Sequence, residues 1–191
     1  VGLLPLVEHL MEMFPEVVHS WFADDGSFCG PAGIVARCFK ELCRVGPMFG
    51  YYPEVEKSIA TCALGHEAAM KAIFAEHDLP VKWSRGERHV GGFVGTKAMR
   101  DRFVRPKVEG WVYAIKVLAK IAGRYPQAAY AGFCRSLQSE WTYLSRAVAG
   151  VEEHLQPVED AIREFLLPAL LRCRPEEIDD DFRRLLSHGV K

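Results

Sequence analysis

From about residue 97 onward, apolar residues recur at the three- and four-residue spacing of an amphipathic helix. The recurring positions are Val104, Val108, Trp111, Ile115, Leu118 and Ala122, then Tyr130, Phe133, Leu137, Trp141, Leu144 and Val148, then Val158, Ile162, Phe165 and Ala169. This spacing places the side chains of each series on one helix face. Three such helices with short breaks between them predict an antiparallel bundle. A further short helix is predicted after Pro175, through Phe182, Leu185 and Leu186.

The first half of the chain mixes strand-like runs with helical ones. Residues 3–13 carry apolar side chains at helical spacing and end at Phe14-Pro15, a helix-breaking pair. Residues 17–22 are rich in β-branched and aromatic side chains and predict a strand, and residues 27–29 predict a short returning strand. Asp24-Asp25-Gly26 lies between them and predicts the turn of a hairpin, because Asp-Gly readily adopts positive φ angles.

The next segments predict a helix after Gly30-Pro31, and then smaller elements. These are a strand at 58–63, a helix at 67–74, and a hairpin of strands 81–83 and 89–94 joined across residues 84–87. Because mixed patterning gives way to purely helical patterning near residues 95–100, we expect two subdomains. The predicted fold class is therefore α+β, with an α+β part at 1–96 and an all-α bundle at 97–191.

Charge is balanced over the whole chain but not locally. The formal net charge of the 191 residues is −1, so no global positive field indicates a nucleic-acid partner. Residues 82–107, however, contain eight basic residues against two acidic ones. The basic residues are Lys82, Arg85, Arg88, Lys97, Arg100, Arg102, Arg105 and Lys107, and the acidic ones are Glu87 and Asp101.

Composition also bears on where the protein resides. The chain has no run of 18 apolar residues, so no transmembrane helix and no membrane partner are expected. Six cysteines show no C-x-x-C pair, which favours reduced thiols and an intracellular protein of the cytoplasm or nucleus that is not secreted. Because the first residue is Val1, we expect the chain to be a piece of something longer.

Asp24 and Asp25 are the strongest candidate for chemistry. Adjacent carboxylates repel each other, and a divalent cation relieves that repulsion. Hard oxygen ligands suit Mg²⁺, which is usually held by one or two carboxylates plus substrate phosphates. The alternative is that Asp-Asp-Gly is an ordinary solvated turn.

The order of motifs resembles a reverse transcriptase (RNA-directed DNA polymerase) of a retroelement. Phe22-Ala23-Asp24-Asp25 matches the aromatic-x-Asp-Asp hairpin of the polymerase palm, and residues 88–95 (RHVGGFVG) resemble the primer-grip hairpin. Residues 1–13 and 39–57 resemble the helices and loop around that hairpin. Residues 97–171, notably QAAYAGF and LQPVEDAIREFLLPAL, resemble a helical thumb or connecting region. The resemblance implies a partial palm, built of antiparallel hairpins with packed helices, followed by a thumb-like bundle.

The resemblance implies roles for residues around the reacting groups. Asp24 would be a principal ligand of two catalytic Mg²⁺ ions, which Mn²⁺ can replace, and Asp25 would support that site. Phe22 would form the floor beneath the primer terminus. Lys57 would face the triphosphate of the incoming deoxynucleotide and donate a proton to the leaving group.

The resemblance also implies contacts with an RNA template and a DNA primer. His89, Val90, Gly91 and Gly92 would hold the primer strand, and Arg100, Arg102, Arg105 and Lys107 would contact phosphates of the duplex. Each role has an alternative. Phe22 fits a core strand residue, Lys57 a solvated lysine, Gly91-Gly92 a bulge, and the basic cluster the wet face of a helix.

A third carboxylate is missing from the polymerase pattern. The acids that precede Asp24 are Glu8, Glu12 and Glu16, and they lie on or beside the predicted first helix. We therefore expect a fragment that is inactive alone and whose intact parent performs nucleotidyl transfer. The alternatives are a non-catalytic nucleic-acid-binding or scaffold remnant of a polymerase fold, and an unrelated helical interaction protein with an incidental Asp-Asp-Gly turn.

Overall fold

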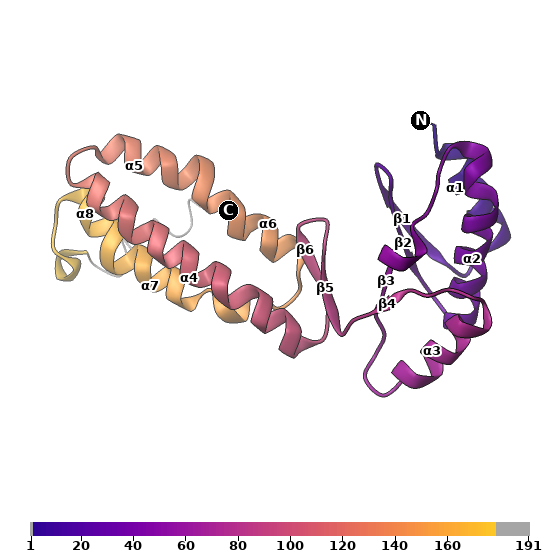
Figure 1. Cartoon of the computed structure of the whole chain (residues 1–191). Coiled ribbons are helices and arrows are strands. Elements are labelled where there is room, and N and C mark those ends of the chain that lie inside the picture. Colours follow the sequence, from indigo (N-terminus) through magenta and orange to yellow (C-terminus); the bar gives the residue numbers. More distant parts are fainter. Residues whose placement is uncertain (1, 179–191) are drawn as a thin grey trace. The chain divides into compact units, whose positions relative to one another are not determined.

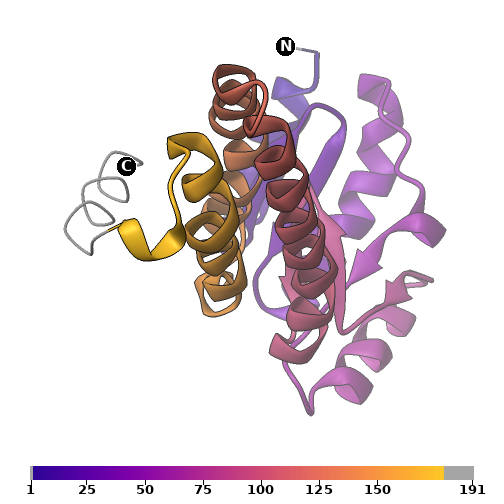
Figure 2. The same cartoon turned by 90° about the vertical axis from the view of Figure 1, so that its left-hand side faces the viewer.

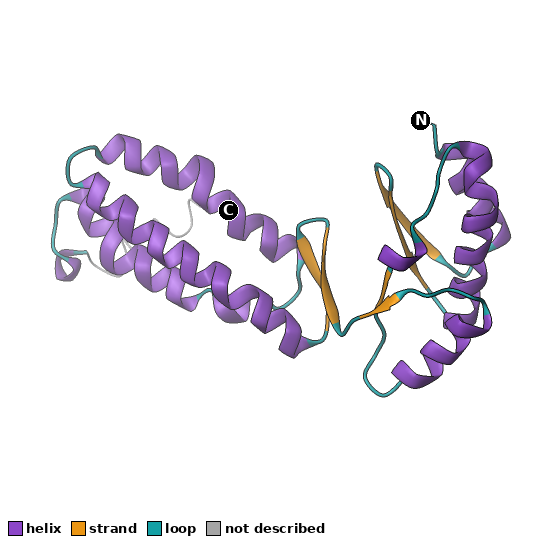
Figure 3. Cartoon of the chain, in the orientation of Figure 1, coloured by secondary structure: helices purple, strands orange, loops and turns teal. Residues whose placement is uncertain are grey.

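The computed structural model describes residues 2–178, and the chain divides into two compact units, residues 1–90 and the residues from Gly91 onward (Figure 1). Both units are rich in helix, and the strands are short and paired in twos (Figure 3). The chain is thus of mixed α+β class. The division falls within a hairpin, whereas the sequence placed the boundary after residue 96.

The first unit combines helices with short strands. Its elements are α1 (Leu4–Met13), β1 (Val18–Phe22), β2 (Asp25–Cys29), α2 (Ala32–Val45), η1 (Gly46–Phe49), η2 (Val55–Lys57), β3 (Ile59–Ala60), α3 (Glu67–Glu76), β4 (Lys82–Trp83) and β5 (Gly86–His89). Strands β1 and β2 form an antiparallel hairpin, and β3 pairs in parallel with β4. Pro15 follows the last turn of α1, where its missing N–H prevents the helix from continuing.

The core of the first unit lies between α1, α2 and α3. Leu6 and Leu10 of α1, Cys38 and Leu42 of α2, and Phe74 of α3 are all buried. The named residues are four positions apart on α1 and on α2, so a single face of each of these two helices is removed from water. Burial of these apolar side chains is the main stabilising contribution to the unit.

The second unit is a helical bundle that begins with one strand. Its elements are β6 (Gly92–Gly95), α4 (Lys97–Ala122), α5 (Pro126–Gly132), the π-helical segment η3 (Phe133–Leu137), α6 (Gln138–Ala147), η4 (Glu152–His154), α7 (Gln156–Ala161), the π-helical segment η5 (Ile162–Leu166), α8 (Leu167–Leu171) and η6 (Pro175–Glu177). Figure 2 shows the long helix α4 beside the other helices of this unit.

The predicted apolar stripe of α4 is confirmed. Val104, Val108, Trp111 and Ile115 are all buried against the two following helical stretches. Trp111 also donates a hydrogen bond from Nε1 to a Glu140 carboxylate oxygen, at 2.8 Å. A buried indole N–H without such an acceptor would be destabilising, so this bond allows a tryptophan at the centre of the bundle.

Two predicted core positions are exposed instead. Tyr130 is 59% exposed and Phe165 is 40% exposed, although both continue the apolar pattern of their helices. Phe165 lies in η5, and Tyr130 lies in α5, three residues before η3 begins. A π-helical turn accommodates an extra residue, which rotates the helix face away from the register that a 3.6-residue period predicts.

Several predicted element boundaries are also wrong. The strand expected at 58–63 contains only Ile59–Ala60, and the helix expected at 67–74 extends to Glu76. Residues 81–83 do not pair with residues 89–94: β4 pairs with β3, and the hairpin is formed by β5 and β6. The helix predicted through Phe182, Leu185 and Leu186 lies outside the described residues.

Candidate functional site

The two aspartates lie at the exposed end of the β1–β2 hairpin. Phe22 pairs with Asp25, so the connection between the strands consists of Ala23 and Asp24 alone. Ala23 has a φ of 55°, which allows the chain to reverse within two residues. The turn thus precedes the predicted Asp-Asp-Gly position, because Asp25 and Gly26 belong to β2. Asp24 and Asp25 are both exposed, and within residues 2–178 neither forms an ion pair.

The inner face of this hairpin is fixed by an aromatic cluster. The Trp21 ring makes edge contacts with Phe28 and Tyr51, at centroid distances of 5.6 and 5.7 Å. The Tyr51 hydroxyl donates a hydrogen bond to the backbone carbonyl of Asp24, at 3.0 Å. Burial, and then the nearby negative charges of Asp24 and Asp25, raise the pKa of Tyr51. Tyr51 therefore stays a neutral donor that holds the turn in place.

The outer face of the hairpin is open to solvent. Phe22 is 65% exposed and Val18 is 69% exposed, because alternate residues of β1 point away from the core. Exposure excludes the core interpretation of Phe22. An exposed aromatic ring directly beside two carboxylates is available for contact with a ligand.

A buried polar pair lies on the inner face. Both ring nitrogens of His19 and the indole nitrogen of Trp21 have no hydrogen-bond partner among the described residues. Burial lowers the pKa of His19, so its ring is neutral near physiological pH. The His19 ring instead packs against Phe28 in a T-shaped arrangement, at a centroid distance of 5.1 Å and an interplanar angle of 79°. His19 therefore behaves as a packing residue.

Lys57 is placed differently from the role that the resemblance implies. It ends η2, and its ammonium group pairs with the Glu54 carboxylate at 2.5 Å. Both side chains are well exposed, with 72% and 66% of their surfaces accessible. Within the described residues, Lys57 thus forms its ion pair with Glu54 rather than with Asp24 or Asp25.

The β5–β6 hairpin turns at Val90 and Gly91. These residues have φ angles of 45° and 79°, as expected for a turn with two left-handed positions. Such angles are strained for a β-branched residue such as Val90. The two glycines therefore do not form the bulge that was the alternative: Gly91 is in the turn and Gly92 begins β6.

One contact of this hairpin is directed at the strand that carries Asp25. Within the first unit, Nε2 of His89 lies 3.0 Å from Oγ of Ser27, within hydrogen-bond distance. Ser27 follows Asp25 by two residues, so both side chains belong to the same face of β2. The structure therefore brings His89 close to the Asp-Asp strand, whereas it does not bring Lys57 into contact with it.

The basic residues at the start of α4 differ in how far they are exposed and in whether they form ion pairs within the protein. Arg100 is only 14% exposed, donates to Asp101 and to the Ala149 carbonyl, and pairs with Glu153. These bonds occupy its guanidinium group within the protein. Asp101 also accepts a hydrogen bond from His154, and the bonds from Arg100 and His154 together lower the pKa of Asp101.

The other cations of the predicted cluster are placed differently from Arg100. Arg102 and Arg105 are exposed and lie one helical turn apart, so they share a face of α4. The Lys107 ammonium lies 5.1 Å from the centre of the Phe103 ring, and Phe103 stacks on Phe93 at 5.0 Å. The wet-helix-face interpretation therefore fits Arg102 and Arg105 as well as a phosphate-contact role does.

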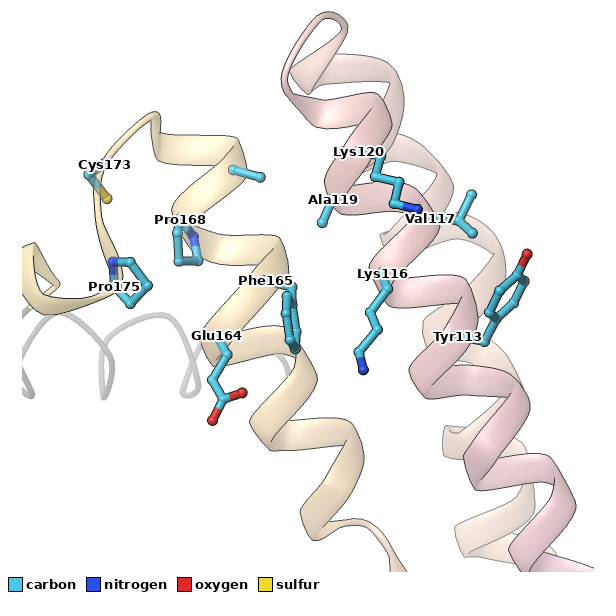
Figure 4. Close-up of a pocket in the computed structure, with 11 residues that line it drawn as sticks. Tyr113, Lys116, Val117, Ala119, Lys120, Glu164, Phe165, Pro168, Cys173 and Pro175 are labelled. Carbon is cyan, nitrogen blue, oxygen red and sulfur yellow. The ribbon is translucent and has the colours of Figure 1, made fainter.

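The donor set suits a hard cation but is small. Two exposed carboxylates are the ligand type that Mg²⁺ or Mn²⁺ prefers. Among residues 2–178, no group of three His, Cys, Asp or Glu side chains is placed to hold a metal ion. Two open hollows in the described part of the chain, one of them drawn in Figure 4, are lined by residues of the second unit, far from Asp24 and Asp25 in the sequence. Asp24 and Asp25 could thus supply two ligands of a metal site, and a complete site would need further ligands.

Comparison with protein-family models, with curated proteins and with solved structures found no match to this chain. Among the described residues, no helix has both the length and the apolar composition required to cross a bilayer.

Sequence reasoning missed the residues that support the hairpins. Tyr51 lies 27 residues from its acceptor Asp24, and Ser27 lies 62 residues from His89. A local signal for Tyr51 was the aromatic pair Tyr51-Tyr52 in a loop rich in Gly and Pro. The sequence did not show that this loop packs on the hairpin that carries Asp24.

Proposed function

We propose that this chain is part of a reverse transcriptase of a retroelement, an RNA-directed DNA polymerase, and that the part is inactive alone. The observation that supports the proposal is the hairpin tip, where Asp24 and Asp25 are exposed beside an exposed Phe22. Trp21 and Tyr51 contact each other beneath the hairpin, and the Tyr51 hydroxyl bonds the Asp24 carbonyl, so the turn that carries the carboxylates is held in place. His89, from the hairpin that resembles a primer grip, adds a second contact on the same strand.

In the intact parent, the primer 3′-hydroxyl oxygen would bond to the α-phosphorus of the deoxynucleotide, and pyrophosphate would leave. Asp24 and Asp25 would hold Mg²⁺, which stabilises the attacking and leaving oxygens in such reactions. Phe22 would contact the terminal primer nucleotide from below, because its ring is exposed on the same side of the hairpin as the Asp25 position. Lys57 would have to exchange its ion pair with Glu54 for the triphosphate.

Phosphate contacts in the proposal come from Arg102, Arg105 and Lys107 rather than from Arg100. The Arg100 guanidinium is committed to Asp101, Ala149 and Glu153, so it acts as a structural residue. In the described part of the chain Arg102 and Arg105 form no ion pair, and they lie on one helix face. The six free cysteines support an intracellular site of action.

The catalytic proposal is tested by primer extension. The chain is joined to the upstream part of its open reading frame and assayed with an RNA template, a DNA primer, deoxynucleotides and Mg²⁺. We expect Asp24→Asn with Asp25→Asn to reduce incorporation by about a thousandfold or more, because metal ligands act as a unit. Asp78→Asn, which changes an exposed aspartate of the same unit, is the matched control. Undiminished incorporation by the double variant would refute the catalytic role.

A non-catalytic nucleic-acid-binding protein is the second candidate function. The exposed helix face that Arg102 and Arg105 share favours it. The hairpin tip supplies only two carboxylates, Asp24 and Asp25, and no group of three potential metal ligands occurs among the described residues. Binding of the chain to an RNA–DNA hybrid is measured by fluorescence anisotropy against salt concentration. Arg102→Gln with Arg105→Gln should reduce the slope of log K against log salt by about 2, roughly one per phosphate contact.

The matched control for binding is Arg135→Gln with Arg163→Gln, two exposed arginines of the same unit. Salt-dependent binding without metal-dependent incorporation, even in the extended chain, would select this second function. Binding that does not respond to salt would contradict both functions, because phosphate contacts release counterions.

A further inference from the structure

Three buried nitrogen atoms on the inner face of the β1–β2 hairpin have no hydrogen-bond partner among the described residues: Nδ1 and Nε2 of His19 and Nε1 of Trp21. Buried polar groups of proteins are nearly always hydrogen-bonded, so an unpaired imidazole requires a physical explanation. A neutral imidazole carries one N–H group, and its burial without a partner is less unfavourable than the burial of a charge. A protonated ring would carry a charge and two N–H groups, for which the described residues offer no acceptor.

His19 belongs to an aromatic cluster that joins the hairpin to α2. It pairs across the hairpin with Phe28, and the two rings pack in a T-shaped arrangement at a centroid distance of 5.1 Å. Phe28 in turn contacts Trp21 at 5.6 Å and Phe39 of α2 at 6.4 Å. Burial in this cluster lowers the pKa of His19, because a charged ring could not be hydrated there.

The hairpin depends on its inner face for attachment to the rest of the unit. Strands β1 and β2 form a sheet of two strands, and such a hairpin is marginally stable unless one face packs on other elements. Its outer face is open to solvent at Val18 and Phe22. A charge on His19 would therefore weaken the packing that holds the hairpin, because the ring nitrogens reach water only when the inner face separates from the core.

Other titratable groups on the elements around the hairpin supply no counter-charge to His19. They are Glu41, Cys38 and Cys43 of α2, Tyr51 of the loop that follows η1, and His89 of β5. The Glu41 carboxylate is already bonded to Arg44 and to His9 of α1. Burial raises the pKa of Cys38 to about 11 and also raises that of Cys43 and Tyr51, so these three groups are neutral. His89 contacts Ser27 on the outer face.

We propose that His19 is a pH-sensitive switch: its neutral ring keeps the β1–β2 hairpin packed on α2, and its protonation releases the hairpin together with the turn that carries Asp24 and Asp25. The direction follows from proton linkage. Because folding lowers the pKa of His19, its contribution to stability is complete above about pH 6.5, the ordinary pKa of histidine, and is lost as the pH falls through the lowered pKa of the folded state. This inference does not depend on the proposed polymerase function.

The experiment measures hydrogen exchange by mass spectrometry in the full chain at pH 7.5 and at pH 5, with each rate divided by the intrinsic chemical exchange rate at that pH. Peptides covering residues 17–29 report the hairpin, and peptides covering α2 report the core of the same unit. We expect the protection of the hairpin to decrease at least about threefold at pH 5, while the protection of α2 stays unchanged.

Two variants without a titratable side chain at this position assign the effect to His19. His19→Phe keeps an aromatic ring against Phe28, so its hairpin should be equally protected at both pH values. His19→Gln should also lose the pH response, and it keeps the test valid if the phenylalanine packs differently. The α2 peptides report whether each variant is folded.

Two other histidines of the first unit supply the controls. His66 is exposed, and His89 is the ring that contacts the outer face of the hairpin, so His66→Gln and His89→Gln should both keep the threefold loss. Equal protection of the unmodified hairpin at both pH values would overturn the proposal. A pH response that persists in both His19 variants, or that disappears in His89→Gln, would also overturn it. An equal loss of protection in α2 would indicate unfolding of the whole unit and would exclude a local switch.

Discussion

Gly91, in the turn of the β5–β6 hairpin, offers a direct test of how backbone strain and side-chain contact combine. Gly91 has a φ of 79°, and a Cβ atom added there would lie 3.1 Å from the Tyr143 hydroxyl oxygen and 3.3 Å from Cε1 of that ring. Gly91→Ala therefore introduces both a left-handed alanine and a tight contact with Tyr143. Tyr143 is 49% exposed, so its ring can move aside partially.

The stability change expected for Gly91→Ala follows from a comparison with Gly50→Ala. A left-handed conformation is unfavourable by about 1–2 kcal/mol for alanine, and the reduced freedom of the unfolded chain offsets about 0.4–1 kcal/mol. Gly50 has a similar φ of 74° but no atom within 4 Å of an added Cβ, so Gly50→Ala isolates the backbone contribution. We expect Gly50→Ala to destabilise its unit by about 1 kcal/mol, and Gly91→Ala to destabilise the second unit by about 2 kcal/mol.

Hydrogen exchange measured against urea concentration reports the stability of each unit separately. Peptides covering α2 report the first unit, and peptides covering β6 and α6 report the second. In a Tyr143→Ala background, the excess cost of Gly91→Ala over Gly50→Ala should disappear, because the contact is gone. An excess that persists in that background, or no excess at all, would refute the steric argument.

Three further outcomes follow from the described contacts. Val90→Asn should stabilise the β5–β6 hairpin by about 1 kcal/mol, measured by the same exchange method, because Asn-Gly suits a turn with two positive φ angles and valine does not; unchanged protection of β6 would contradict this. Ile115→Ala should lower the free energy of unfolding of the second unit by about 3 kcal/mol, since Ile115 is fully buried, whereas Ile121→Ala on the same helix, at a position 41% exposed, should lower it by much less. Hydrogen bonds from Arg44 and His9 lower the pKa of Glu41 to about 2 from 4.5, so the ionised carboxylate stabilises the first unit above pH 4.5 and loses that contribution as the pH falls toward 2. Glu41→Gln should therefore destabilise this unit by about 1 kcal/mol at pH 7, after allowance for solvent screening, and by nothing near pH 2, with Glu12→Gln as the control; a difference that does not change with pH would exclude the ion-pair explanation.

Some features of this fold depend on residues close together in the sequence, and others on residues far apart. This difference explains which sequence-based expectations agree with the structure. The α4 stripe and the helical stretches after it were predicted because periodicity is a local property of the chain. The Asp-Asp hairpin was also predicted, within two residues of its turn, because β-branched runs flank a short polar segment. Strand pairing was not predicted correctly from the sequence, because β4 pairs with β3 rather than with the next strand along the chain.

The sequence by itself determined the helices, the Asp-Asp hairpin and the accumulation of basic residues near the start of the bundle. Only the tertiary structure decided that Phe22 is exposed, that Arg100 is committed to Glu153, 53 residues further along the chain, and that Phe165 leaves the core. The physical reason is distance along the chain. A helix or a tight turn is fixed by interactions among residues a few positions apart, whereas exposure and ion pairing depend on elements that lie tens of residues away and meet only when the core forms.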